Sequence, residues 1–287
     1  LKNAGVSMPD AIITGTGLGC VKDTEKFLTL ILENNENFLN PTSFIHSTHN
    51  TIGSQIALGL NCNRYNQTYA HKAFSFESAL LDGMMLLEEK NGEHVLVGGV
   101  DEMTDILYTI SRRFGNYKRK SVNSANLIIS NSKGTMPGEG AAFFVLSGSP
   151  GINDYAKISD VLTVYKPDNE DDIERHLSKF LSANNIELDT LDLILMGNNG
   201  DNRFDTIYKK LETGLLNGKS IGYYKHLCGE YHTSTSFALW LAANILKKQA
   251  VPKEICDNPP KNNVYKNILI YNHHRNENHS FILLEKC

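Results

Sequence analysis

Nucleophilic, basic and acidic side chains gather in one short segment, residues 225–232, which reads Lys-His-Leu-Cys-Gly-Glu-Tyr-His. If the segment is extended, alternate residues share a face, and that face carries His226, Cys228, Glu230 and His232. Imidazole, thiolate and carboxylate groups are typical zinc ligands, so an extended segment would offer a metal site. A turn into a helix would scatter these side chains instead. Cys228 is also a candidate displaced nucleophile, although no helix N-terminus is obviously aimed at it.

A second place where chemistry could occur is a sharp elbow at residues 69–73. Thr68–Glu102 has the pattern of a strand, an elbow, an apolar helix and a second strand. A cysteine at such an elbow would be a nucleophile, because the helix N-terminus lowers the pKa of the thiol. Here the elbow reads Tyr69-Ala70-His71-Lys72-Ala73 and holds no cysteine. His71 could act as a general base, or it could only satisfy backbone groups.

Composition excludes several classes of function. The 287 residues carry a formal net charge of −4 with a pI near 6.2, which gives no basic footprint for nucleic acid. No apolar run approaches the roughly 20 residues that span a bilayer. The five cysteines are scattered and lack C-x-x-C spacing, which favours a reducing compartment, so we expect a cytoplasmic protein. Leu1–Gly5 has the pattern of a last helical turn closed by glycine, and we expect that a segment precedes it.

Strands and helices alternate along the chain, which favours mixed or parallel sheets with helices on both faces. Apolar periodicity predicts helices at residues 23–34, 76–89, 171–183, 206–216 and 233–248, and a helical stretch within residues 41–60. It predicts strands at residues 11–17, 65–69, 94–99, 138–146, 156–165, 191–197, 267–271 and 280–285.

A cluster of glycine, proline and serine at Ser147–Asp154 is the best boundary candidate. The order of helix and strand at residues 76–99 returns at residues 233–271, which suggests an internal duplication. We therefore expect an N-terminal half at residues 1–150 and a C-terminal half at residues 151–287.

Two groups of basic residues are expected at the surface. Residues 105–126 form a polar excursion, and its basic run Arg112–Lys120 is either a solvated loop or a surface for an acidic partner. His273, His274 and His279 are expected in loops or on the surface.

Five short motifs, in order, resemble those of the β-ketoacyl synthase family, the condensing enzymes of the thiolase fold. The matching segments are Asp10–Gly17, His94–Glu102, Pro137–Leu146, Asn198–Asp205 and Lys225–Thr235. In the same order, the first segment resembles the family's second strand with its glycine turn, the second the strand ending Gly-Gly-x-x-Glu, and the third the G-E-G-A strand. The fourth resembles a degenerate G-T-G-T-x-x-G-D loop, and the fifth the motif K-x-x-x-G-H-x-x-x-A. The resemblance implies an α/β thiolase-like, five-layered α-β-α-β-α fold of two duplicated halves, with the N-terminal strand and helix missing.

The resemblance also implies where catalytic groups would lie. That family uses a cysteine thiolate, two neutral histidines that stabilise the oxyanion, and a lysine that orders the site. The position of the cysteine falls on Ala70 or His71. The first histidine falls on Gly197 or Asn198 and the second on Glu230, and the lysine is matched by Lys225. A carboxylate at the second histidine position repels the enolate that condensation must stabilise, unless the carboxylate is buried and neutral.

These positions lead us to expect a non-condensing homologue, similar to the chain-length or chain-initiation subunits that pair with an active synthase in fatty acid, polyketide or polyene biosynthesis. The expected partners are a homologous ketosynthase subunit, or a second copy through the strand at residues 65–69, and an acyl carrier protein. A metal is not expected, because the family places a turn into a helix at residues 225–235, which would scatter the candidate ligands. No cofactor is expected either. The residues expected to line an acyl pocket are Tyr69, Phe74, Phe76, Cys228 and His232.

Two alternatives stay open. One is an active β-ketoacyl-acyl-carrier-protein synthase, an acyltransferase, whose rearranged site uses His71 or Cys228. The other is a homodimeric acyl-binding or scaffold protein that has no partner enzyme.

Overall fold

The protein divides into two compact units, each built around one mixed sheet. The computed structural model describes residues 1–37, 40–256, 259 and 264–287. Unit 1 comprises Leu1–Phe114, Pro137–Ser149 and Tyr231–Ser236. Unit 2 comprises Gly115–Met136, Pro150–Glu230 and Phe237–Cys287.

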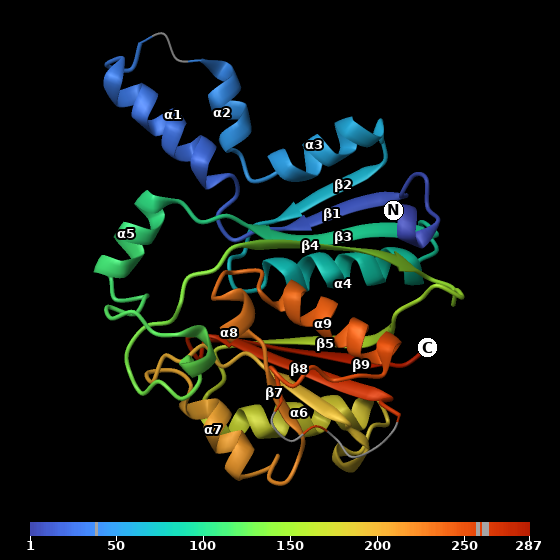
Figure 1. Cartoon of the computed structure of the whole chain (residues 1–287). Helices are drawn as coiled ribbons and strands as arrows, with labels where there is room; N and C mark the ends of the chain where they lie inside the picture. The colour runs from blue at the N-terminus through green and yellow to red at the C-terminus, as the bar shows by residue number, and fades with distance from the viewer. Residues whose placement is uncertain (38–39, 257–258, 260–263) are drawn as a thin grey trace. The chain divides into compact units, whose positions relative to one another are not determined.

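Unit 1 has a four-stranded sheet in the order β2-β1-β3-β4, in which only β4 runs antiparallel to its neighbour (Figure 1). Its strands are β1 (Ala11–Gly15), β2 (Tyr65–Tyr69), β3 (His94–Asp101) and β4 (Gly140–Ser147). Its helices are η1 (Lys2–Ala4), α1 (Val21–Glu33), α2 (Pro41–Ser47), α3 (Thr51–Leu60), α4 (Ser75–Glu88) and α5 (Asp105–Arg113). Figure 1 shows α4 running along the sheet, while α1 and α2 form a pair that stands clear of it.

Helix α4 forms because apolar and small residues recur at helical spacing from its first turn. Phe76, Ala79 and Leu80 are fully buried, and Phe76 packs on Phe144 of β4 with ring centroids 6.0 Å apart. A Cβ at Gly83 would lie 2.6 Å from a Val97 methyl group, so glycine lets the helix approach β3 closely. One face of the sheet is therefore covered by α4.

A buried carboxylate ties together three segments of unit 1. Asp101, at the end of β3, accepts hydrogen bonds from Thr16 Oγ1 at 3.2 Å and from the Gly17 amide at 2.7 Å. It also accepts from the amide and the hydroxyl of Thr233, both at 2.8 Å. The side chain thus fixes the glycine turn after β1 against the segment Tyr231–Ser236, and four donors that would otherwise be orphaned are satisfied.

Unit 2 has a five-stranded sheet in the order β5-β9-β8-β6-β7. Its strands are β5 (Lys157–Tyr165), β6 (Leu193–Met196), β7 (Ile221–Tyr223), β8 (Asn267–His274) and β9 (Asn278–Glu285). Its helices are η2 (Ser124–Asn126), α6 (Glu170–Ala183), η3 (Leu188–Thr190), α7 (Thr206–Thr213), α8 (Lys225–Cys228) and α9 (Thr235–Lys248), of which the first two residues of α9 belong to unit 1. Side chains of α6 and α7 pack on β6, β8 and β9 to form its core.

The two sheets repeat the same hydrogen-bond detail at the entry to their central strands. In unit 1 the Asp10 carboxylate accepts from the amides of Glu93 and His94, at 2.8 and 3.0 Å. In unit 2 the Asp192 carboxylate accepts from the amides of Lys266 and Asn267, at 2.6 and 2.9 Å. Each aspartate, which directly precedes β1 or β6, therefore caps the first residues of the neighbouring parallel strand.

The predicted strands and the long predicted helices form, with boundaries shifted by a few residues. The stretch within residues 41–60 forms two helices, α2 and α3, with a break at residues 48–50. Helix α5 differs from the prediction of an irregular excursion at residues 105–126. Thr104 caps it by accepting a hydrogen bond from the Leu107 amide at 3.2 Å, and Ile106 and Ile110 stay about half exposed, so its apolar stripe contributes little to the core. Strand β7 was not predicted, since its three residues are too few to show a period.

The prediction that His273 and His279 lie in surface loops is wrong. They belong to β8 and β9 and are only 4% and 1% exposed, because the β8–β9 hairpin is buried along nearly its whole length. Tyr271 and His279 are hydrogen bonded through the hydroxyl and Nδ1 at 3.0 Å. Burial lowers the pKa of His279 to about 4 and that of His273 well below its usual range, so both imidazoles are neutral at pH 7. His274 is half-buried at the end of β8.

Among the described residues, no helix is long and apolar enough to cross a membrane.

Candidate functional site

The elbow between β2 and α4 places its exposed residues away from the start of the helix. Ala70 and His71 are exposed, and the His71 ring stacks on Phe74 at a centroid distance of 5.4 Å. Lys72 turns the chain with a φ of 60°, and α4 begins only at Ser75. The residues closest in sequence to the free amides of α4 are therefore 73–75. They lie a few residues after Ala70 and His71, where the resemblance places the cysteine.

The hydroxyl at the start of α4 is not free to act as a nucleophile. Ser75 carries the only hydroxyl between residues 70 and 76. It is fully buried, and its Oγ donates a hydrogen bond to the Thr16 carbonyl at 2.8 Å. A Cβ at Gly15 would overlap the Ser75 backbone, so the start of α4 is packed tightly against the end of β1. The hydrogen bond of Ser75 therefore holds the start of α4 against the end of β1.

The residues expected to line a pocket in unit 1 differ in their surroundings. Phe76 belongs to the packed core, as described above. Tyr69 is half-buried, and burial raises the pKa of its phenol, with a further contribution from the charge of Asp82 and the hydrogen bond to it. Phe74 is 8% exposed. The His232 ring lies over Gly17, where any Cβ would overlap it.

In unit 2, three polar side chains close on one another. The Lys225 ammonium, which is fully buried, lies 3.0 and 2.8 Å from the two carboxylate oxygens of Glu230. Asn199 Nδ2 donates to the same carboxylate at 2.6 Å. The geometry follows from the backbone: α8 ends after one turn, and Gly229, with a φ of 75°, reverses the chain so that Glu230 folds back on Lys225. The pair neutralises its own charge.

The zinc hypothesis for residues 225–232 needed an extended segment, and the structure has α8 followed by a turn there. His226 Nε2 is paired with the Glu254 carbonyl at 2.8 Å, and the Cys228 thiol lies 3.3 Å from the Gly229 carbonyl oxygen. Glu230 is committed to Lys225. Across residues 1–37, 40–256, 259 and 264–287, no group of three or more histidine, cysteine, aspartate or glutamate side chains could hold a metal ion.

The environment of Cys228 opposes formation of a thiolate. Burial is the main cause that raises the pKa of this thiol to about 12; the Glu230 carboxylate adds to the rise and Lys225 opposes it. At pH 7 the side chain is a neutral thiol, which is a poor nucleophile.

Of the two positions that follow β6, only Asn198 has room for a side chain. A Cβ at Gly197 would overlap Asn272 Oδ1 and would lie 2.8 Å from the Tyr208 hydroxyl. Asn198 is 7% exposed, and its Oδ1 accepts no hydrogen bond from the described part of the chain. Asn198 is therefore the side chain that this strand end presents.

We expect the exchange of Gly197 for alanine to destabilise the protein by about 2 kcal/mol, because buried side chains that cannot move aside must shift. The matched exchange Asn198→Ala should cost less than about 1 kcal/mol, since it removes an atom without a partner. Urea unfolding of both variants checks this order, and equal losses would show that the site around Gly197 adapts.

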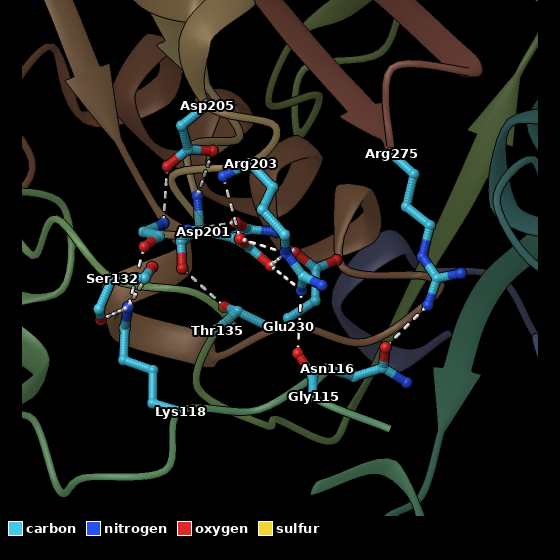
Figure 2. Close-up of polar contacts among 12 residues, drawn as sticks. Gly115, Asn116, Lys118, Ser132, Thr135, Asp201, Arg203, Asp205, Glu230 and Arg275 are labelled. Atoms are coloured by element: carbon cyan, nitrogen blue, oxygen red, sulfur yellow. Dashed lines mark hydrogen bonds and ion pairs between the residues drawn. The ribbon is translucent and has the colours of Figure 1, made fainter. Parts of the chain in front are cut away.

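The loop that carries Asn198 and Asn199 is held from several sides (Figure 2). Lys118 Nζ donates to the Gly200 carbonyl and to Ser132 Oγ, each at 2.9 Å, and the Thr135 hydroxyl donates to the Asn199 carbonyl at 2.7 Å. Lys118 is only 8% exposed, so this member of the basic run Arg112–Lys120 does not belong to a solvated surface. Its buried ammonium holds the loop in place through these hydrogen bonds. The loop is thus rigidly positioned by residues 115–136.

One salt bridge and two further hydrogen bonds extend this set of contacts toward the surface. The Arg203 guanidinium contacts the Asp201 carboxylate, with Nε at 2.9 and 3.2 Å from its two oxygens, and donates to the Gly115 carbonyl at 2.9 Å. Arg275 donates to the Asn116 side chain at 2.9 Å (Figure 2). The motif at Asn198–Asp205 indicated this loop in part, but no pattern in the sequence indicated Lys118 or Thr135, which reach the loop from a distant segment.

Asp205 closes the same loop by accepting from the Asn199 and Gly200 amides, at 3.3 and 2.7 Å. Burial nevertheless raises the pKa of this carboxyl to about 6. A raised pKa means that the folded state holds the proton more tightly than the unfolded state. This contribution to stability is therefore present below about pH 4 and is lost as the pH rises through about 6.

We expect the stability difference between the natural protein and the variant Asp205→Asn to shift by about 2 kcal/mol in favour of the variant between pH 4 and pH 7. Urea titrations of both proteins across this range measure it. The subtraction removes the pH dependence of all other groups, and a flat difference would contradict the raised pKa.

Comparison with known proteins gives structural matches alone. No protein-family model and no curated protein sequence matches the chain. The ishigamide ketosynthase/chain length factor matches with a TM-score of 0.76 and 15% identity, covering 100% of this chain and 78% of that one. A second match is the structure of a type II PKS acyl-carrier protein in complex with its ketosynthase. Its TM-score is 0.77 at 14% identity, and the match covers 98% of this chain and 78% of that one.

A third match is a ketosynthase in complex with its chain length factor from Xenorhabdus doucetiae, with a TM-score of 0.74 and 12% identity, covering 98% of this chain and 75% of that one. Identities this low establish the fold and not the activity. The match over the full chain confirms the expected fold at this level: the protein has the mixed α/β fold of the thiolase-like ketosynthases.

Proposed function

We propose that the protein is a ketosynthase-like subunit that does not condense acyl groups itself and that works beside an active, homologous ketosynthase. The observation that carries this proposal is the closed Lys225–Glu230–Asn199 group. It occupies the positions at which the resemblance places the lysine and the second histidine of a condensing site.

The chemistry of condensation explains why this group matters. Decarboxylation and carbon–carbon bond formation build negative charge on an oxygen, which must meet preorganised hydrogen-bond donors. Here the Lys225 ammonium already faces a carboxylate, and the neighbouring amide Asn199 donates to that same carboxylate. Donors that are consumed within the protein leave nothing for a developing enolate, and Glu230 would add repulsion.

The alternative of a rearranged synthase is less well supported. A thiol whose pKa is raised to about 12 is not a ready nucleophile, which argues against Cys228. His71 is exposed and stacks on Phe74, and residues 70–73 of the elbow carry no hydroxyl or thiol that it could activate.

A partner surface for the proposed subunit is the outer edge of β2. This strand lies at the end of its sheet, and its first three residues are exposed and polar or aromatic. Tyr65 is held there by a hydrogen bond from its hydroxyl to Asp82 at 3.0 Å. An open edge of this kind can pair with a strand of a homologous subunit or of a second copy. We infer in addition that the two units are duplicated halves, because their sheets repeat the Asp10 and Asp192 caps.

Reconstitution tests the proposal. The chain is purified with a homologous ketosynthase that has an intact cysteine and two histidines, together with acyl carrier protein and malonyl thioester. We expect no product from this chain alone and a change in product length when it is added to the partner. The exchange Phe74→Ala should alter that length while Phe114→Ala, a surface control, should not. Turnover by the isolated chain, or a product unaffected by its presence, would overturn the proposal.

A further inference from the structure

Two histidines lie opposite each other in the buried β8–β9 hairpin. His273 pairs in register with His279, and the centroids of their rings are 5.5 Å apart. The His273 ring stacks on Tyr208 of α7 at a centroid distance of 4.4 Å, and His279 contacts the Tyr271 hydroxyl. Among the described residues, neither Nε2 atom has a hydrogen-bond partner. The pair is therefore buried among aromatic side chains, where an ion loses its hydration.

The charges around His273 do not favour its protonation either. Burial is the main cause that lowers the pKa of this imidazole, and His279, Lys225 of α8 and His274 lower it further. The backbone of Phe204 acts in the opposite direction, but it does not outweigh these causes. A proton on His273 would therefore add a cation beside Lys225 in the closed structure.

The surroundings of His279 are similar. Burial is again the main cause that lowers the pKa, His176 of α6 adds to it, and the backbone of Asn276 opposes it. Two carboxylates act on the phenols of this core: Glu170 of α6 on Tyr271, and Asp205, ahead of α7, on Tyr208.

The turn that closes the hairpin is strained. Arg275 and Asn276 both have a φ of 55°, and the Glu277 amide donates to the His274 carbonyl at 3.1 Å, which is the pattern of a type I′ turn. Glycine and asparagine suit such positions, whereas arginine adopts a positive φ only at a cost. Contacts with the surrounding structure must therefore keep the turn closed.

His273 supplies one of these contacts, and protonation would reverse its role. The Asn276 amide donates to His273 Nδ1 at 3.3 Å, so Nδ1 is an acceptor and the neutral ring carries its proton on Nε2. A protonated imidazole has a donor at both nitrogens. Nδ1 would then point an N–H group at the Asn276 amide, and the hydrogen bond would be lost.

The turn is also connected to the segment that positions residues 198–205. Arg275 donates to Asn116 Oδ1 at 2.9 Å (Figure 2). Asn116 lies two residues ahead of Lys118, whose ammonium donates to the Gly200 carbonyl within the loop. A turn that opens would therefore remove one contact of the segment that holds this loop.

We propose that the β8–β9 turn is a pH-sensitive switch. Protonation of the His273 ring opens the hairpin from its turn to this residue, and the contact with Asn116 is lost with it. The opened hairpin takes up the proton near the ordinary histidine pKa of about 6.5, whereas the closed hairpin does not. Closure is therefore favoured at neutral pH and weakens as the pH falls below about 6.5. This inference concerns a conformational change within unit 2 and does not depend on the proposed function.

Hydrogen exchange followed by mass spectrometry tests the switch, with the rates corrected for the intrinsic effect of pH. We expect the protection of residues 272–280 to fall about thirtyfold between pH 7.5 and pH 5.0, because an open state that takes up one proton gains that factor in population. Strands β1 and β3 report on the unfolding of unit 1, and their protection should change by much less.

A variant that cannot be protonated separates His273 from the other titrating groups. His273→Asn keeps an acceptor for the Asn276 amide. Its protection should be lower at both pH values, because the stack on Tyr208 is lost, but the ratio between them should shrink to about threefold or less. The matched control His274→Asn, at the next position of β8, should keep the thirtyfold ratio. The proposal is overturned if the natural protein shows no such ratio, if His273→Asn keeps it, or if His274→Asn loses it.

The variant Asn116→Ala tests the connection to the loop. In the natural protein the acid response should extend to residues 198–205, and in Asn116→Ala it should be confined to residues 272–280. Proton uptake by Asp205 acts on the loop in the opposite direction, but it occurs in both proteins and cancels in their comparison. An equal acid response of residues 198–205 in both proteins would overturn the connection through Asn116.

Discussion

Exchanging Glu230 for alanine should lower the free energy of unfolding by about 3 kcal/mol. The reason is that the fully buried Lys225 ammonium loses the carboxylate that lies 2.8 Å away, and an uncompensated buried charge is costly. Asn199 loses its acceptor at the same time. The measurement is urea unfolding at pH 7, followed by circular dichroism.

Two further variants show whether the pair or the glutamate alone is responsible. Glu230→Gln keeps an acceptor and should cost less than the alanine exchange. The double variant Lys225→Met with Glu230→Ala should recover most of the loss, since it removes both charges. A loss below about 1 kcal/mol in the single alanine variant would mean that Lys225 does not rely on Glu230.

Exchanging Asp101 for alanine should cost about 4 kcal/mol, the largest effect expected in unit 1. Four hydrogen bonds from Thr16, Gly17 and Thr233 end on this buried carboxylate, and each donor left without an acceptor carries a desolvation cost of about 1–3 kcal/mol. Some of that cost is relieved by rearrangement or by water entering the site.

The variant Asp101→Asn keeps one acceptor oxygen, so it should lose about half as much. Asp105→Ala, at an exposed aspartate four residues later, is the control and should stay within about 1 kcal/mol of the natural protein. If Asp101→Ala and Asp105→Ala unfold at similar urea concentrations, then Asp101 does not hold the glycine turn against Tyr231–Ser236.

The fold could be predicted from the sequence where periodicity is strong. Buried strands such as β3 and β8 are continuous apolar runs, and α4 and α9 repeat small and apolar residues at helical spacing. The prediction for His273 and His279 is wrong, because a polar residue type does not by itself indicate exposure. Their imidazoles are tolerated inside the hairpin as neutral groups beside Tyr271.

The candidate site could be predicted only in part, since its geometry depends on contacts between distant segments. The sequence indicated Lys225 and Glu230, but their pairing depends on the reversal at Gly229. It left Gly197 and Asn198 as equal choices, and the difference lies in side chains from β8 and α7 that fill the space next to Gly197. Lys118 was grouped with exposed basic residues, although it reaches a loop 82 positions away.

The measurement that tests the central proposal most directly is intact mass spectrometry after incubation with a labelled acyl thioester. A homologous ketosynthase with its cysteine intact serves as the positive control and should gain one acyl group. We expect this chain to keep its unmodified mass under the same conditions, because its elbow has no cysteine and its Cys228 is a neutral thiol. A stable, stoichiometric acyl adduct on this chain would contradict the proposal that it has no condensing site.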